Sequence, residues 1–360
     1  MRVKLEDVCE RGSSNIKQSD IIKMSGNYPI YGASGLAGKV NFYHQEQPYV
    51  AVVKDGAGIG RTTLNPAKSS VIGTMQYLIP KKNVLPEYLF YVVSYMHLEK
   101  YYTGATIPHI YFKDYKNEEF NLDNIEKQLE IIDVLGRCKK VIEARKQELV
   151  ELDSLTKARF VEMFGDPRSN PFGFEKKRLK RYVQSYYWQY TFTSNREYYG
   201  DYIEWIKTDN IVSGILNPTQ ATESLSEKGM NVGRTVEKDS ILMACIAGSI
   251  ASIGRVCITD RTVAFNQQIN AVVPEQYNIL FLYVLFQMSK DYLVEDINMA
   301  LKGILSKSKL EEKEFIIPPM DLQEQFSDFV KQVDKSKVAV QKALDETQIL
   351  FDSLMQKYFG

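Results

Sequence analysis

Cysteine and histidine are scarce in this 360-residue chain. The four cysteines are Cys9, Cys138, Cys245 and Cys257, and no two of them form a C-x-x-C pair. Sparse, unpaired thiols argue against a disulfide framework, so we expect reduced and buried cysteines. The three histidines do not have the spacing of metal ligands, and we therefore predict no metal site.

Long apolar runs and excess charge are also missing. No stretch approaches the roughly 18 uninterrupted apolar residues of a membrane span. The charged start Met1–Asp7 lacks the apolar core of a secretion signal, so we expect a cytoplasmic protein. Lys plus Arg and Asp plus Glu both number 45, which gives zero net charge. This weakens the picture of a basic protein that coats nucleic acid, although acidic helices can balance a basic face.

One segment suggests a cofactor loop, but the residues after it argue against this interpretation. Asp55–Gly60 comes after an apolar stretch and resembles a nucleotide or S-adenosylmethionine loop. Such a loop needs a helix next, whereas Arg61–Pro66 is β-branched and ends in proline. The related segment Gly248–Arg255 keeps only the first and last glycines. We interpret both segments as tight turns between strands.

Catalytic motifs are not evident either. Methylation of a base amine calls for an Asn/Asp-Pro-Pro-aromatic tetrapeptide, and the nearest strings, Asp166–Ser169 and Asn170–Gly173, lack the second proline. No Ser/His/Asp or Cys/His arrangement stands out. The sequence therefore predicts neither a catalytic centre nor a bound cofactor.

The chain does contain a long internal repeat. Ile59-Gly60-Arg61 recurs as Ile253-Gly254-Arg255, and Asp153-Ser154-Leu155 recurs as Asp352-Ser353-Leu354. A period of this length indicates two copies of one module rather than a solenoid of short units. In each copy a globular region precedes a long helix. We predict 1–122 and 166–320 as the globular domains, with 123–165 and 321–360 as the helices.

Within each globular region the order of elements is the same. We expect strands, then a glycine turn, then another strand and a helix, which is an α+β pattern. The expected strands and helices are Tyr49–Val53, Met75–Ile79 and Pro86 to about Tyr102 in the first copy, and Ser240–Ala244, Asn270–Pro274 and Ile279–Tyr292 in the second.

The two long helices carry heptad repeats of apolar residues. The positions that we expect at the seam are Leu135, Ile142, Leu149 and Leu152 in the first helix and Val333, Val340, Leu344 and Phe351 in the second. A helix of about 38 residues is about 57 Å long and overhangs a small domain. We therefore predict an antiparallel coiled coil that joins two pseudo-symmetric domains, with Leu135, Ile142 and Leu149 against Val333, Val340 and Leu344. The alternative is that each helix packs only on its own domain.

Polar and basic residues gather at the turns of both globular regions. They are Lys54, Arg61, Thr62, Gln76, His109, Tyr111 and Lys113 in the first copy, and Ser249, Ser252, Arg255, Asn266, Gln267, Gln268, Lys302 and Lys307 in the second. Arg, Asn and Gln hydrogen-bond base edges, whereas Lys, Ser and Thr commonly meet phosphates. We expect Arg61 to match Arg255, and Gln76 to match Gln268, and we take the set as candidate DNA contacts.

With these residues in place, the chain resembles the specificity subunit of type I restriction-modification enzymes over its whole length. The segments that carry this resemblance are Val3–Val8, Tyr28–Gly35, Ile206–Ile211, Val236–Met243, Phe265–Gln267, Ile317–Met320 and Gln323–Gln325. The first copy departs from the pattern at the start of its helix, where Asn121–Asp123 replaces the proline pair and only Gln128 of the glutamine motif remains.

The resemblance implies two target-recognition domains, each of which reads one half of a split site on double-stranded DNA. It also implies that the helices hold a fixed distance and dock two methylation subunits, with restriction subunits completing the complex. The chain itself is then non-catalytic and holds no cofactor. S-adenosylmethionine, ATP and Mg belong to the partner subunits, and the assembled complex is a DNA adenine methyltransferase and ATP-dependent endonuclease.

Two other functions remain open from the sequence. A stand-alone DNA methyltransferase requires the missing tetrapeptide and an intact glycine loop. A coiled-coil adaptor that never touches DNA leaves the matched polar turns of the two copies without a role.

Overall fold

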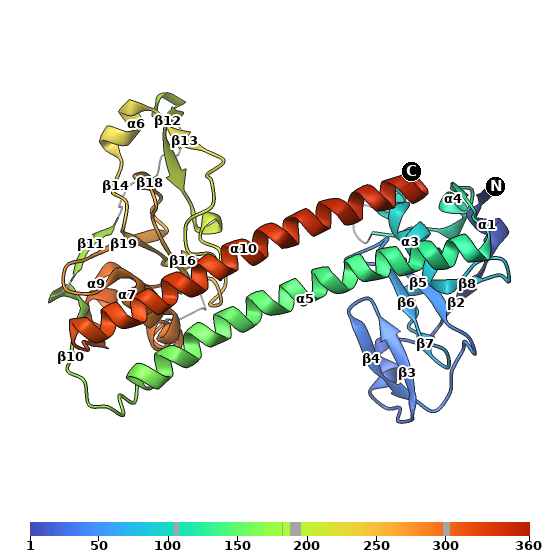
Figure 1. The fold of residues 1–360 in the computed structure, drawn as a ribbon, viewed down its shortest axis with the longest axis horizontal. Coiled ribbons are helices and arrows are strands. Elements are labelled where there is room, and N and C mark those ends of the chain that lie inside the picture. Colours follow the sequence, from blue (N-terminus) through green and yellow to red (C-terminus); the bar gives the residue numbers. More distant parts are fainter. Residues whose placement is uncertain (104–107, 182, 188–195, 298–302) are drawn as a thin grey trace. The chain divides into compact units, whose positions relative to one another are not determined.

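The computed structural model describes residues 1–103, 108–181, 183–187, 196–297 and 303–360. The chain divides into two compact units: unit 1 comprises Met1–Lys146 and Lys342–Gly360, and unit 2 comprises Gln147–Gln341. Two helices of 40 residues each, α5 (Ile125–Phe164) and α10 (Met320–Phe359), contribute to both units (Figure 1). Each unit combines helices with antiparallel sheet, as an α+β fold requires.

Unit 1 is built around a sheet with the strand order β2-β8-β5-β6 and a smaller sheet with the order β4-β3-β7. Its elements before α5 are β1 (Arg2–Lys4), α1 (Leu5–Val8), β2 (Cys9–Ser13), α2 (Gln18–Ile21), β3 (Tyr28–Gly32), β4 (Gly35–Val40), β5 (Tyr49–Val53), β6 (Thr62–Asn65), β7 (Ser70–Val71), β8 (Met75–Pro80), α3 (Pro86–Tyr95), α4 (Phe112–Tyr115) and β9 (Glu119–Asn121). A short 3-10 helix, Leu98–Tyr101, follows α3.

Unit 2 repeats this plan with the sheet β11-β19-β15-β17. Its elements between α5 and α10 are β10 (Lys176–Arg178), β11 (Val183–Tyr187), β12 (Tyr199–Ile206), β13 (Ser224–Leu225), α6 (Glu227–Val232), β14 (Thr235–Val236), β15 (Ile241–Ala244), β16 (Ile246–Ala247), β17 (Val256–Ile258), β18 (Val263–Phe265), β19 (Ile269–Pro274), α7 (Ile279–Met288), α8 (Lys290–Val294), β20 (Gly303–Ile304), α9 (Lys307–Glu312) and β21 (Glu314–Ile316). Three short 3-10 helices lie at Leu179–Arg181, Arg196–Tyr198 and Thr208–Asn210.

The backbone hydrogen bonds establish which residues of the two units are equivalent. Val53 donates its N–H to the carbonyl of Arg61 (2.9 Å), and Ala244 donates to the carbonyl of Arg255 (2.9 Å). In each unit the glycine before the arginine donates back across the same turn. These glycines, Gly60 and Gly254, have φ angles of 80° and 78°, which L side chains rarely adopt. The sequence match at this turn is therefore also a structural match.

The glycine segments are turns between strands, as the sequence predicted. Asp55–Gly60 leads from β5 into the strand β6, and Gly248–Gly254 leads into the strand β17. β5 is buried on both faces and reads as a continuous apolar run, which explains why its sequence does not alternate. A helix N-terminus follows neither turn.

The helix predicted from Pro86 to about Tyr102 is shorter than expected. α3 ends at Tyr95, and His97 adopts a left-handed conformation (φ 51°) before the 3-10 helix begins. The left-handed residue interrupts the helical hydrogen bonds, a break that the apolar pattern does not reveal. In the second copy, α7 likewise ends at Met288 and the short α8 follows it.

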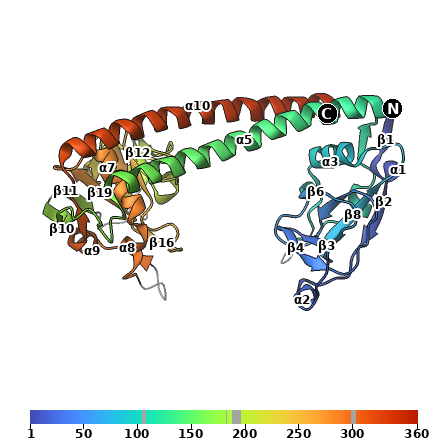
Figure 2. The same cartoon turned by 60° about the horizontal axis from the view of Figure 1, so that its bottom comes forward.

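Both long helices pack into the core of each unit. In unit 1, Ile131 and Leu135 of α5 share a cluster with Met355 and Phe359 of α10, and α3 lies between these helices and the sheet (Figure 2). In unit 2, Phe160 of α5 packs edge-on against Phe326 of α10, with ring centroids 5.5 Å apart. The early part of α5 thus meets the late part of α10, and the reverse, which makes the pair antiparallel.

The residues predicted at the seam are buried or half-buried along both long helices. Five of the eight seam residues are buried, and Leu149, Leu152 and Phe351 are half-buried. Leu135 lies in the unit 1 cluster with Met355 and Phe359 of α10. The seam thus merges with the apolar core of each unit, and both helices contribute to both cores, which contradicts the alternative that each helix packs only on its own domain.

The cysteines are free thiols, and the part of the chain that the structure describes has no cluster of metal-ligating side chains. The four cysteines are free; Cys9, Cys245 and Cys257 are buried and Cys138 is half-buried. Within the described ranges, no three His, Cys, Asp or Glu residues are grouped so that they could hold a metal ion. In the same part of the chain, no helix is long and apolar enough to cross a membrane.

Candidate nucleic-acid interface

Four of the candidate residues in unit 1 come together in one cluster of loops. His109 pairs with Asp55 in an isolated β-bridge, and its Nδ1 lies 2.5 Å from an Asp55 carboxylate oxygen. The His109 ring stacks on Tyr111, and the Lys113 ammonium lies 5.3 Å from the centre of the Tyr111 ring. Lys54 lies 3.5 Å from Asp55. We call these five residues the unit 1 loop cluster; two lysines, a histidine and an exposed tyrosine suit contact with a polyanion.

Arg61 lies at the turn that follows this cluster, and it braces a neighbouring loop. Its Nη1 donates a hydrogen bond to the carbonyl of Ala33 (3.0 Å), just after β3. The residue is exposed. Thr62, the next residue, donates its hydroxyl to the carbonyl of Gly60 (3.2 Å). Arg61 therefore braces this loop from an exposed position.

Gln76 is a correction to the candidate set. Its side chain is 4% exposed, and its carbonyl accepts a hydrogen bond from the hydroxyl of Tyr115 (3.1 Å). Burial raises the pKa of Tyr115, which keeps the phenol protonated as the donor. Gln76 supports the interior of unit 1 and does not reach a DNA surface.

The expected match of Gln76 with Gln268 is also wrong. Lys54 donates its N–H to Thr74, and the equivalent Cys245 donates to Gln268, so Gln268 corresponds to Thr74. Gln76 corresponds instead to Asn270, which is fully buried in β19. Both residues are glutamines, but Gln76 lies two residues further along its strand than Thr74, the residue equivalent to Gln268.

In unit 2, three of the candidate residues gather at the glycine turn. The hydroxyls of Ser249 and Ser252 are 3.1 Å apart, and Nε of Arg255 donates to the carbonyl of Ser252 (3.3 Å). Nη2 of Arg255 donates to the carbonyl of Thr208 (3.3 Å). Thr208 lies two residues after Ile206 of β12, and Ala33 lies two residues after Tyr31, which has the equivalent place in β3. The two arginines therefore brace equivalent loops.

The remaining candidate residues of unit 2 lie outside the glycine turn and have other roles. Asn266 is 6% exposed and accepts a hydrogen bond from the N–H of Gln268 (3.0 Å), so it holds the turn before β19. Its neighbour Gln267 is more accessible. Lys307 begins α9 and lies 3.6 Å from Glu311. Lys302 lies outside the described residues.

The sequence did not reveal how the two units differ at matching positions. The bridge between Asp55 and His109 in unit 1 corresponds to the pair Ile246 and Ile304 in unit 2. Ile304 is 46% exposed, so unit 2 presents an apolar side chain where unit 1 presents a histidine. These pairs join distant parts of the chain, and only the fold brings them together. The two units carry different chemistry on one scaffold.

The two units have equivalent topology, and each has a braced arginine turn. Both share the two antiparallel helices. Together they define a two-headed α+β recognition protein. The model of the type I restriction modification DNA specificity domain matches residues 1–153 and 174–347. The chain therefore belongs to this family, which confirms the resemblance found in the sequence.

Individual relatives agree with this assignment. The type I restriction enzyme HindI specificity subunit of Haemophilus influenzae is 32% identical over 117 residues, which are 32% of this chain and 24% of the relative. The match thus spans about a quarter of that relative's length. The crystal structure of an S subunit of a type I system from M. genitalium covers 100% of this chain and 96% of its own, with a TM-score of 0.64 and 15% identity.

A further solved structure shares the fold. It describes complex assembly and conformational transition of a type I system, and it covers 99% of this chain and 97% of its own, with a TM-score of 0.56 and 14% identity. At these identities the likeness concerns the fold.

Proposed function

We propose that the chain reads a bipartite DNA site, with unit 1 recognising one half-site and unit 2 the other. The observation that carries this proposal is the equivalence of the Arg61 and Arg255 turns, each braced against the loop after an equivalent strand. A braced turn holds neighbouring donors at fixed positions, which base recognition requires. The different side chains at the matching positions of the two units give the two halves different sequences.

The proposed contacts in unit 1 are the loop cluster with Arg61 and Thr62. In unit 2 they are Ser249, Ser252, Arg255, Gln267, Gln268 and Lys307, with Asn266 shaping the turn and Lys302 kept as a sequence-based proposal. Ile304 adds an apolar contact of the kind that meets a thymine methyl group. The zero net charge of the chain leaves part of the phosphate contact to partner subunits.

The partners are double-stranded DNA, two methylation subunits docked on the long helices, and restriction subunits, assembled in the cytoplasm. The chain contributes recognition and holds no cofactor, while S-adenosylmethionine, ATP and Mg are bound by the partners. The division into recognition domains 1–122 and 166–320 with helices 123–165 and 321–360 is part of this proposal.

Selection of the preferred target from a pool of random DNA tests the function. The chain, reconstituted with its methylation subunits, is expected to enrich two short conserved blocks separated by an unread gap. One continuous block would argue against two reading units. No enrichment at all, with an assembled complex, would favour the adaptor alternative.

The stand-alone methyltransferase is tested by the isolated chain. Calorimetric titration with S-adenosylmethionine is expected to give no binding to the chain alone and clear binding to the assembled complex. Binding by the isolated chain would contradict the assignment of that cofactor to the partner.

A further inference from the structure

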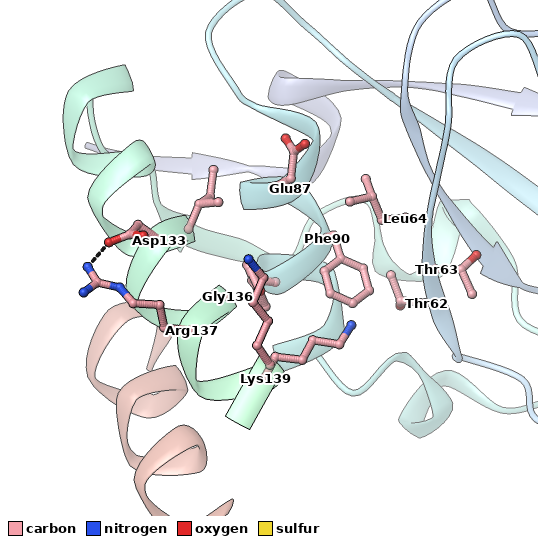
Figure 3. A pocket seen from close by; sticks show the side chains of 12 residues that line it. Thr62, Thr63, Leu64, Glu87, Phe90, Asp133, Gly136, Arg137 and Lys139 are labelled. Atoms are coloured by element: carbon pink, nitrogen blue, oxygen red, sulfur yellow. Dashed lines mark hydrogen bonds and ion pairs between the residues drawn. The ribbon is translucent and has the colours of Figure 1, made fainter. Parts of the chain in front are cut away.

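An open groove runs along the free edge of the main sheet in unit 1. It encloses about 660 Å³ between β6, α3 and the part of α5 around Gly136 (Figure 3). β6 is the last strand in the order β2-β8-β5-β6, so among the described strands none pairs with its outer side. The residues that line the groove are Thr62, Thr63, Leu64, Glu87, Phe90, Tyr91, Ile132, Asp133, Gly136, Arg137, Lys139 and Lys140.

The register of β6 shows which backbone groups face this groove. Val53 donates to Arg61, and hydrogen-bonded pairs alternate along an antiparallel ladder. Leu64, which lies opposite Val50, is therefore in a non-bonded pair and directs its N–H and carbonyl away from β5. Outward-facing backbone groups on an edge strand form a template for an additional strand.

The equivalent edge in unit 2 is closed by the chain's own backbone. Ile258 lies opposite Ile241 in β17, as Leu64 lies opposite Val50. The N–H of Ile258 donates to the carbonyl of Leu216 (2.8 Å), and Nδ2 of Asn217 donates to the carbonyl of Ile258 (2.8 Å). A space of only about 30 Å³ remains between Leu216, Tyr283 of α7 and Asp334 of α10. In unit 2, this sheet edge is thus occupied by a peptide segment of the chain itself.

Unit 1 lacks the segment that closes the edge in unit 2. That segment belongs to residues 207–223 between β12 and β13, where Lys337 holds it through the carbonyl of Gly214 (2.9 Å). The equivalent strands of unit 1, β3 and β4, are joined by only Ala33 and Ser34. No part of the described chain in unit 1 can therefore play the same role.

The basic side chains that line the groove, Arg137, Lys139 and Lys140, outnumber the acidic ones, Glu87 and Asp133, which favours an acidic occupant. In the described part of the chain, neither Lys139 nor Lys140 forms an ion pair, whereas Arg137 is paired with Asp133. The Lys139 ammonium lies 5.0 Å from the centre of the Phe90 ring at the wall of the groove (Figure 3). The equivalent positions of α10 hold Asp334 and Lys335. Two unpaired ammonium groups beside a free strand edge are complementary to carboxylates on an extended peptide.

We propose that the β6 edge of unit 1 binds an extended, acidic segment of a methylation subunit, which joins the sheet as an additional strand. This inference rests on the proposed function, because the partner is taken from it. It adds an asymmetry: one unit offers an open edge to a partner, and the other has closed the same edge with its own loop.

Hydrogen exchange at the amide of Leu64 tests the proposal in the full chain. We compare the chain alone, the chain with a duplex that carries its target, and the chain assembled with methylation subunits. Exchange is expected to slow by at least about tenfold in the assembled complex only. Unchanged exchange in a complex that still methylates its target overturns the proposal. Slowing by DNA alone, or by raising the concentration of the chain alone, also overturns it in favour of DNA or a second copy.

Charge reversal on the groove supplies a second measurement. Lys139→Glu with Lys140→Glu is expected to weaken the affinity for the methylation subunit roughly tenfold. Lys238→Glu, at an exposed position of unit 2 outside the long helices, is the control and is expected to stay within about twofold. Equal effects of the two variants overturn the proposal. Failure of the wild-type chain to bind methylation subunits overturns the proposed function itself and, with it, this inference.

Discussion

Gln128 in α5 and Gln323 in α10 make the same hydrogen bond in the two units. Oε1 of Gln128 accepts from the N–H of Leu85, and Oε1 of Gln323 accepts from the N–H of Asn278, both at 2.9 Å. Each acceptor residue is at most 1% exposed, and each donor residue caps the helix that follows, α3 or α7. The start of the first long helix is therefore held like that of the second, although only the second has the proline pair.

Removing either glutamine is expected to destabilise its unit. Gln128→Ala leaves the N–H of Leu85 and the carbonyls of Asn83 and Asp123 without their buried partner. We expect a loss of about 1–3 kcal/mol in the free energy of unfolding, measured by urea denaturation. The exposed Gln147→Ala is the control, with an expected change within about 0.5 kcal/mol. Equal losses in both variants would refute this role for Gln128.

Cysteine reactivity is expected to single out Cys138. Burial raises the pKa of the Cys9, Cys245 and Cys257 thiols to about 12, so these thiols stay protonated at pH 8. The thiolate is the nucleophile, and their reactivity should rise only as the pH approaches that value. Mass spectrometry after brief iodoacetamide treatment should show one adduct, on Cys138, in the native chain and four after denaturation. Native labelling of Cys245 at the rate of Cys138 would contradict the burial.

The long helices are predicted to act as the ruler between the half-sites. Adding one heptad to both keeps the apolar seam in phase and lengthens the pair by about 10.5 Å. At about 3.4 Å of axis per base pair, the preferred gap should grow by about three base pairs. Selection from a pool with randomised gaps measures this, and the half-site sequences serve as the internal control. An unchanged gap would mean that the helices only bind partner subunits.

The repeat made much of the fold predictable. The matched Ile-Gly-Arg triplets gave the equivalence of Arg61 and Arg255, because a tight turn depends on local glycine positions that a sequence records directly. The same approach failed for Gln76 and Gln268, because strand register is set by pairing with a distant strand. Matching residue types is no guide to that pairing.

Other features depend on contacts that no local pattern encodes. Glu118 and Lys313 occupy equivalent positions, since each accepts at its carbonyl from the leucine after the first strand of its unit, Leu5 or Leu179. Glu118 pairs with Lys100, whereas Lys313 pairs with Glu295 (3.2 Å). The charge at this position is reversed between the two units, so a comparison of residue types finds no relation. The loop that closes β17 was missed for a similar reason.

The division of the DNA site between the two units is tested most directly by Arg61→Ala and Arg255→Ala in the reconstituted complex. Affinities are measured for the selected target and for two altered targets, each with one half-site changed. Arg61→Ala is expected to lose about 1–3 kcal/mol of binding and to become insensitive to changes in one half-site only, and Arg255→Ala to changes in the other only. If both variants weaken binding uniformly across all DNA sequences, the arginines only contact phosphate or brace their turns, and the assignment of one half-site to each unit is contradicted.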